Sequence, residues 1–300
     1  MELSCTRLAA LLVVPLVTTA CIGAELDSDP EALLAEAESA LVSDNGYLPN
    51  ALSLNALSLN ALSLNALSLN ALSLNALSSN SLSAIKDPGT NGSLARELLR
   101  YVVSCSLRPD QTFSFSWTDA NGVVHPEVYR GDLGYAHWWT TTPLGTATTN
   151  NTYVQGQITA CLAARMNWYG VSVRISLRNN EMASTPEERA AFPVREGAFW
   201  GNVFSTTQAP YLRACYSPAG VARARQLQRD CAAGHLSVDP VTGATAVQPC
   251  GSMQIVGSCD TVCNGKDYVN GFYRGCIRNS SVSPWERTDE VITTFLTAGP

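Results

Sequence analysis

The chain has 300 residues, of which 46% are hydrophobic and 15% are charged, and its net charge is −6 at pH 7. The excess acid lies early: residues 1–92 carry nine acids and two bases, whereas the remainder carries 16 acids and 17 bases. A near-neutral domain lacks the clustered lysine and arginine that neutralise phosphates, so no nucleic acid is expected as a partner.

Residues 1–20 have the layout of a secretory signal peptide. Their apolar run, residues 8–17, is about half of the ~20 residues that a membrane-spanning helix needs. Cys21 directly follows Ala20, and this ending resembles the lipobox of bacterial lipoprotein precursors. The resemblance implies that Cys21 becomes the first mature residue and receives lipid, such as palmitate, on its sulfur and its amino group. Cleavage after Ala20 by the general signal peptidase, without lipid, is the alternative.

The predicted location follows from this anchor. Ile22, and not an aspartate, comes after Cys21, which by the same resemblance favours the outer membrane or cell surface over retention at the inner membrane. Several acyl chains hold a protein durably on a bilayer. We therefore expect an exported, lipid-anchored chain whose partner at this end is the membrane.

Two regions precede the main domain. Residues 21–45 form an acidic leader in which residues 30–42 are predicted to be helical, because Pro30 suits the first helical position. Residues 46–85 form a repeat that spells ALSLN five times over residues 51–75. A period of five fits neither a flat strand nor an amphipathic helix. The repeat is therefore expected to be either a low-complexity spacer or a short β-solenoid resembling pentapeptide-repeat coils.

Residues 93–300 are long enough for one compact domain, and their patterns predict an α+β fold of a few helices and short strands. One helix is expected over residues 93–105, capped by Ser93, and another from a cap at Thr152 to just before Gly170. A third starts in the capping box at Thr185. The remaining regular segments are expected to be strands: residues 113–117, 171–178, 198–204 and 254–259.

Eight cysteines follow the anchor, and in an exported chain they are expected to form four disulfides. Zinc is the alternative, but the chain contains no Cys-x-x-Cys pair. Both long helices carry one cysteine on the predicted buried stripe, so Cys105 is predicted to pair with Cys161. The spacing of the other six cysteines does not determine how they pair. The full set is Cys105, Cys161, Cys215, Cys231, Cys250, Cys259, Cys263 and Cys276. The six from Cys215 onward are expected to hold a loop-rich region.

The sequence contains no motif of nucleophilic or metal-dependent catalysis, so neither a catalytic residue nor a metal or cofactor is predicted. It has only three histidines and neither a Gly-x-Ser-x-Gly elbow nor a His-Glu-x-x-His motif. The Ser83-x-x-Lys86 pattern lies at the end of the repeat, where chance explains it. The loop after Asp260 lacks the bidentate acid of a calcium loop.

The best candidate ligand site is YRGDLGYAHWW, residues 129–139. Adjacent aromatic and polar side chains of this kind form shallow platforms on which sugar rings stack. The alternative is that these side chains cover the core. The candidate ligand-binding residues are Arg130, Asp132, Tyr135, His137, Trp138 and Trp139.

Several phrases resemble a set of uncharacterised, cysteine-rich secreted lipoproteins of gliding, predatory soil bacteria. These phrases are CSL at residues 105–107, CLAARMNWYGVSVRISLR at residues 161–178 and REGAFWGN at residues 195–202, together with the cysteine-dense tail. The resemblance covers about residues 93–300 and implies no activity.

Two functions are therefore expected. The first is a non-catalytic surface lipoprotein, a binding or structural module whose partner is a glycan or a surface protein. The alternative is an exported hydrolase of polysaccharide or peptidoglycan that uses carboxylates such as Asp132 or Glu196. A glycosidase of that kind needs two acids facing one cleft.

Overall fold

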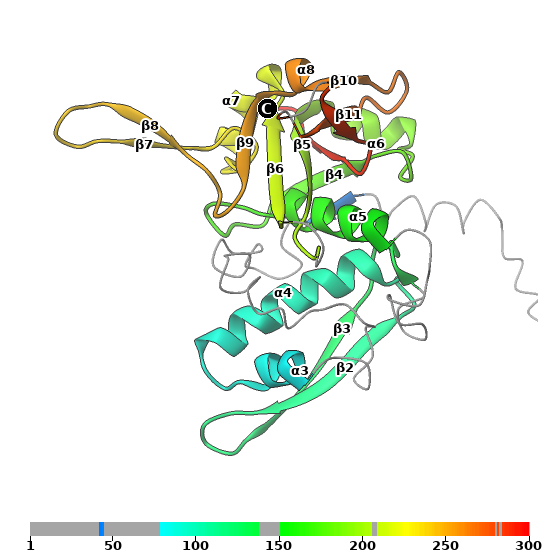
Figure 1. The fold of residues 1–300 in the computed structure, drawn as a ribbon, viewed down its shortest axis with the longest axis vertical. Coiled ribbons are helices and arrows are strands. Elements are labelled where there is room, and N and C mark those ends of the chain that lie inside the picture. The colour runs from blue at the N-terminus through cyan, green and yellow to red at the C-terminus, as the bar shows by residue number, and fades with distance from the viewer. Residues whose placement is uncertain are drawn as a thin grey trace, which may run out of the picture.

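The computed structural model describes residues 42–44, 79–137, 151–205, 209–279, 281 and 284–299. Within them the chain combines helices and sheets, as the α+β prediction requires (Figure 1). Four disulfides brace this part of the chain. The signal peptide, Cys21 and most of the repeat lie outside the described residues. The described end of the repeat, residues 79–85, belongs to a helix and contains no solenoid.

A six-stranded sheet forms the centre of the fold, with the strand order β1-β4-β13-β5-β6-β9. All neighbouring strands are antiparallel except β6 and β9, which are parallel. The first strand comes from the acidic leader and overlaps the end of the helix predicted there. The strands are β1 (Val42–Asp44), β4 (Arg174–Arg178), β5 (Val194–Asn202), β6 (Tyr211–Tyr216), β9 (Gln254–Ser258) and β13 (Ile292–Leu296).

Strand β5 is buried on both faces, which explains its nearly continuous apolar run. On one face Phe199 joins the main core with helix α5 (Asn151–Ala164). On the other face Ala198 and Trp200 join a second core that contains four disulfide-bonded cysteines. The segments predicted as strands around β4, β5 and β9 are thus confirmed.

A second layer lies beside the sheet and consists of helices α3 (Ser79–Lys86) and α4 (Thr90–Ser106) with the hairpin of β2 (Thr112–Thr118) and β3 (Val124–Arg130) (Figure 1). The predicted inner stripe of α4 is confirmed, since Leu98, Tyr101, Val102 and Cys105 are buried. The Cys105–Cys161 disulfide joins α4 to α5, as predicted.

Helix boundaries differ from the prediction at three places. Helix α4 begins at Thr90, one turn before Ser93, so Ser93 is not its cap. Helix α5 includes Asn151, so Thr152 is not its cap, and it ends at Ala164 and does not continue toward Gly170. The reason lies in Asn167, whose side chain accepts the backbone N–H of Tyr169 and donates to the Val171 carbonyl, closing a turn in place of the helix.

The domain also begins earlier than residue 93. Ile85 in α3 is 1% exposed and lies in the main core. Arg96 of α4 fixes this helix by donating to the backbone carbonyls of Ile85 and Asp87. The last residues of the predicted repeat are therefore part of the folded domain.

Helix α6 (Pro186–Ala191) starts at the predicted cap. The Thr185 hydroxyl accepts the backbone N–H of Glu188 at 3.0 Å. The Glu188 carboxylate accepts from the Ser176 hydroxyl, and so only one half of the expected box forms. Desolvation by burial raises the pKa of Glu188.

We expect Thr185→Ala to lower the free energy of unfolding by about 1 kcal/mol, because it removes the cap hydrogen bond to the Glu188 N–H. Urea denaturation measures this change, and Thr185→Ser serves as the control because serine caps equally well. An alanine variant as stable as the serine variant would show that the cap contributes nothing.

The region from Cys215 onward is more regular than predicted. It contains a three-stranded sheet of β10 (Cys263–Lys266), β11 (Tyr273–Asn279) and β12 (Glu286–Thr288). Short helices precede it: a 3-10 turn at Pro218–Gly220, α7 (Val221–Gln226) and α8 (Cys259–Val262). The Cys215–Cys259 and Cys263–Cys276 disulfides tie these elements together.

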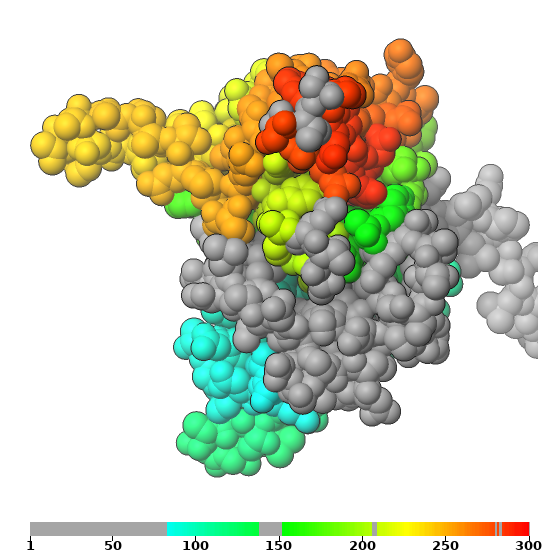
Figure 2. Space-filling view, in the orientation of Figure 1, coloured from blue at the N-terminus to red at the C-terminus, as the bar shows by residue number. Residues whose placement is uncertain are grey.

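One hairpin projects from the body, formed by β7 (His235–Val238) and β8 (Thr245–Gln248) (Figures 1 and 2). The Cys231–Cys250 disulfide closes its base. Val241 at its tip is 91% exposed. Beyond its base the hairpin therefore depends mainly on its own ladder.

Among the described residues, no helix is both long and apolar enough to cross a membrane.

Candidate ligand-binding site

The predicted platform, residues 129–139, closes the C-terminal end of α4. The backbone N–H groups of Asp132, Leu133, Gly134, Tyr135 and Ala136 donate to the carbonyls of residues 104–107. The last carbonyls of a helix have no partner within the helix. This segment supplies those partners, so its irregular course has a structural cause.

Two of the candidate residues are held by contacts within the domain. Asp132 pairs with the buried guanidinium of Arg165 at 2.8 Å, and Arg165 also donates to the Ser104 hydroxyl. Tyr135 is 8% exposed, and its hydroxyl accepts from the Asn179 amide. Burial raises the pKa of Tyr135 well above its ordinary value. Tyr135 therefore offers no face to a sugar ring, and the Asp132 carboxylate, whose side chain is 18% exposed, is already paired with Arg165.

Of the other four candidate residues, the structure describes two, Arg130 and His137. Arg130 is exposed, and its Nε donates to the Pro109 carbonyl at 2.5 Å. His137 is half-buried, and its Nε2 accepts from Arg108 at 2.9 Å. Trp138 and Trp139 lie outside the described residues. The described part of this segment therefore forms no stacking platform.

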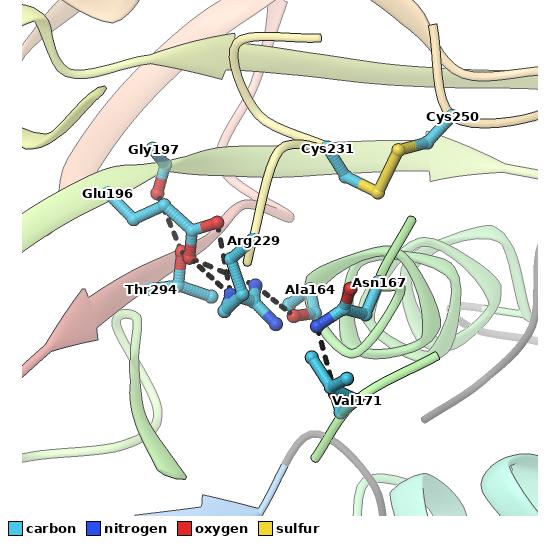
Figure 3. A network of polar contacts seen from close by, with 9 residues as sticks. All are labelled: Ala164, Asn167, Val171, Glu196, Gly197, Arg229, Cys231, Cys250 and Thr294. Carbon is cyan, nitrogen blue, oxygen red and sulfur yellow. Dashed lines mark hydrogen bonds and ion pairs between the residues drawn. A yellow bond between two sulfur atoms is a disulfide. The ribbon is translucent and has the colours of Figure 1, made fainter. Parts of the chain in front are cut away.

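Glu196 lies in the core because of a β-bulge. Thr294 pairs with Gly197 and Phe295 with Arg195, which leaves Glu196 as the extra residue of β5. A bulge redirects the side chain that it contains. The Glu196 carboxylate consequently meets Arg229, whose Nε lies 3.1 and 2.9 Å from its two oxygens (Figure 3).

The ion pair has further partners, although the buried Nη1 of Arg229 has none among the described residues. Arg229 Nη2 lies 2.9 Å from Glu196 and donates to the Ala164 carbonyl at the end of α5. The Thr294 hydroxyl donates to the same carboxylate at 2.8 Å (Figure 3). Both charged side chains are at most 1% exposed. Because Asp132 and Glu196 are each held by an arginine, the hydrolase based on these two acids is not supported.

A different group of side chains reaches the surface where α5 has ended. We call Trp168, Tyr169, Asp230 and His235 the aromatic cluster. The rings of Trp168 and His235 stack with centroids 4.3 Å apart and planes 9° apart. The Tyr169 ring meets His235 edge-on, with centroids 5.5 Å apart.

Asp230 holds the aromatic cluster together. Its carboxylate oxygen Oδ2 lies 2.9 Å from His235 Nδ1 and accepts from the Tyr169 hydroxyl at 3.1 Å. The Asp230 side chain is 4% exposed, whereas Tyr169 is 44% exposed. Desolvation and the charge of Asp230 raise the pKa of Tyr169. The cluster thus presents an oriented tyrosine to solvent.

A surface hollow of about 420 Å³ lies between the segment that follows the Asn167 turn and the end of α7. Its lining begins at Val171 and includes Gln226, and none of the four residues of the aromatic cluster is part of it. The full lining is Val171, Ser172, Val173, Arg174, Gln226, Leu227, Gln228 and Thr297.

Sequence reasoning did not find this site. Trp168 falls inside the helix predicted up to Gly170, and its partners Asp230 and His235 lie more than 60 residues away. No spacing rule connects segments that distant. A sequence signal that could have drawn attention to His235 is the rarity of histidine, with three in 300 residues.

In the part of the chain that the structure describes, no group of three or more His, Cys, Asp or Glu residues is arranged to hold a metal ion. No family model matches the chain. Comparisons with curated proteins and with solved structures also return no match. Function must therefore be argued from the site itself.

Proposed function

We propose that this protein is an exported lipoprotein, anchored at the outer membrane or cell surface through Cys21, whose domain is a non-catalytic binding module for a glycan or a surface protein. The observation that carries the proposal is the contrast between its acids and its aromatics. Asp132 and Glu196 are held by arginines, whereas Tyr169 is exposed and its hydroxyl is held by Asp230.

Two further features support the proposal. Four disulfides suit an oxidising compartment outside the cytoplasm. An exposed aromatic face beside polar groups is a frequent design for glycan recognition, because the face covers the apolar side of a sugar ring. The hydrolase alternative would need acids other than Asp132 and Glu196.

The anchor is tested by the intact mass of the mature amino terminus from cells that express the full chain. We expect Cys21 to carry a diacylglyceryl group and an amide-linked acyl chain, and Cys21→Ser to release the protein from the membrane fraction. An unmodified Cys21 in the wild type would contradict the anchor.

The binding function is tested by incubating the mature chain with insoluble cell-wall fractions. We expect retention on the fraction, without release of soluble sugars or peptides. Reducing-sugar and amine assays detect turnover. Steady release of products by the wild type would favour the hydrolase, and absence of retention on every fraction would contradict the binding module.

A further inference from the structure

We propose that the loop connecting β10 to β11 contacts the lipid headgroups of the membrane that carries the anchor, through Tyr268 and Val269. We call this loop, residues 267–271, the tip loop. The inference rests on the proposed anchor and adds a second contact with the bilayer. Tyr268 is fully exposed and Val269 is 67% exposed, so the fold itself does not use their apolar side chains. The tip loop projects from the body on a different side from the β7–β8 hairpin (Figures 1 and 2).

Hydrogen bonds fix the backbone of the tip loop beneath these two side chains. One carboxylate oxygen of Asp267 accepts the backbone N–H groups of Val269 at 3.0 Å and of Asn270 at 2.7 Å. The Asn270 amide oxygen in turn accepts from the backbone N–H and the hydroxyl of Ser184, at 3.0 and 2.8 Å. A loop that is already ordered loses little conformational entropy when its tip binds a surface.

The tip loop and the start of β1 are held by the same strand, β4. Arg178 of β4 donates to the Asn270 carbonyl at 3.2 Å. Val42, the first residue of β1, pairs with Ser176, two residues before Arg178. Neighbouring strands lie about 4.8 Å apart, so residues 22–41 join the domain close to the tip loop. Among exposed apolar surfaces, one near this attachment point reaches the bilayer with the least extension of the linker.

The side chains on and beside the tip loop suit a lipid headgroup region. Tyrosine is enriched where membranes meet water, because its ring is apolar and its hydroxyl reaches the headgroups. Lys266 and Arg274, in the strands that carry the tip loop, are exposed and can face headgroup phosphates. Two nearby acids are already satisfied, since Asp260 pairs with Lys266 and Asp267 accepts hydrogen bonds inside the loop.

A weak contact is sufficient in an anchored chain. A short flexible linker gives its second site an effective concentration on the order of millimolar. A contact with a dissociation constant between about 0.1 and 1 mM is then roughly half to nine tenths occupied. Two exposed side chains can supply this affinity because the anchor has already brought the domain to the surface.

The test uses the lipidated full mature chain in vesicles of phosphatidylethanolamine and phosphatidylglycerol. Hydroxyl-radical labelling, read by mass spectrometry, measures how accessible each tyrosine is. We expect labelling of Tyr268 to fall roughly two- to tenfold relative to the Cys21→Ser chain in solution, as the expected occupancy requires. Tyr169 is 44% exposed and lies beside the start of β7, so it should keep its labelling rate and serves as the control.

Tryptophan variants localise the contact. Tyr268→Trp places a fluorophore on the tip loop, and Val241→Trp places one at the exposed tip of the β7–β8 hairpin. With brominated lipid in the vesicles, we expect quenching of the emission that Tyr268→Trp adds to the six native tryptophans, and none of the emission that Val241→Trp adds. Val269→Asp, added to Tyr268→Trp, should remove this quenching because it puts a carboxylate into the contact, whereas Val269→Ile should keep it. Thermal unfolding confirms that each variant is folded.

Three results would overturn the inference. They are full labelling of Tyr268 on vesicles that carry the chain, equal quenching at both tips, or protection that grows with the number of chains per vesicle, which would mean that a second copy covers the tip loop. Flotation with the vesicles tests the anchor separately. A chain that floats with Tyr268 unprotected keeps the anchor and loses this contact, whereas a wild-type chain without lipid on Cys21 does not float and removes both.

Discussion

Replacing Arg229 with methionine is expected to lower the free energy of unfolding by about 3–5 kcal/mol. The variant leaves the Glu196 carboxylate buried with only the Thr294 hydroxyl as a hydrogen-bond donor among the contacts described above. An unpaired charge in the protein interior keeps its desolvation cost and loses its compensation. For a domain of this size the change corresponds to a fall in Tm of about 6–20 °C, measured by calorimetry.

Two controls separate the unpaired charge from loss of packing. The double variant Glu196→Leu with Arg229→Met removes both charges, and we expect it to recover most of the lost stability. Lys266→Ala breaks the exposed Lys266–Asp260 pair and should cost no more than about 1 kcal/mol. A double variant as unstable as the single one would show that shape, and not charge, makes Arg229 necessary.

Removing the Cys105–Cys161 disulfide by replacing both cysteines with alanine is expected to cost about 4 kcal/mol. The chain-entropy relation gives this value for partners 56 residues apart. This disulfide is also the covalent link between α4 and α5, so the unfolded chain gains freedom between the two layers of the molecule. Denaturant unfolding under non-reducing conditions measures the difference.

The Cys263–Cys276 disulfide offers the matched comparison. Its partners are 13 residues apart and face each other across β10 and β11, so the ladder already holds them together. The same relation gives about 3 kcal/mol for its removal. We expect the cost to be smaller than for Cys105–Cys161, and the reverse order would contradict an entropic origin of the difference.

Periodicity was sufficient to predict helices α4 and α5 and one disulfide. The stripe of α4 and the inner residues of α5 follow from helical spacing, and their cysteines pair because both lie on those stripes. The ends of the helices were less predictable, since α5 stops at a turn made by the Asn167 side chain and not at a glycine. Side-chain hydrogen bonds of this kind leave no periodic trace.

The predicted platform shows what sequence analysis could not decide, namely which aromatic residues are buried. In the sequence, aromatic residues of an irregular segment look the same whether they face solvent or the core. The burial of Tyr135 is visible only in the folded structure. The bulge at Glu196 depends on the register of β13, a strand about 100 residues away. The aromatic cluster likewise depends on segments that meet only after the sheet has formed.

Strand β1 changes how the ALSLN repeat can affect the distance between the domain and the membrane. Residues 42–44 pair with β4, and α3 packs on α4, so both ends of the segment 45–78 are held by one domain. For a segment between two points of one body, each doubling of its length costs only about 0.6 kcal/mol of closure entropy. In the proposed anchored protein, residues 22–41 alone would then set the reach from the bilayer, at most about 70 Å. Adding or deleting copies of ALSLN is then expected to leave the height of the domain above the membrane unchanged.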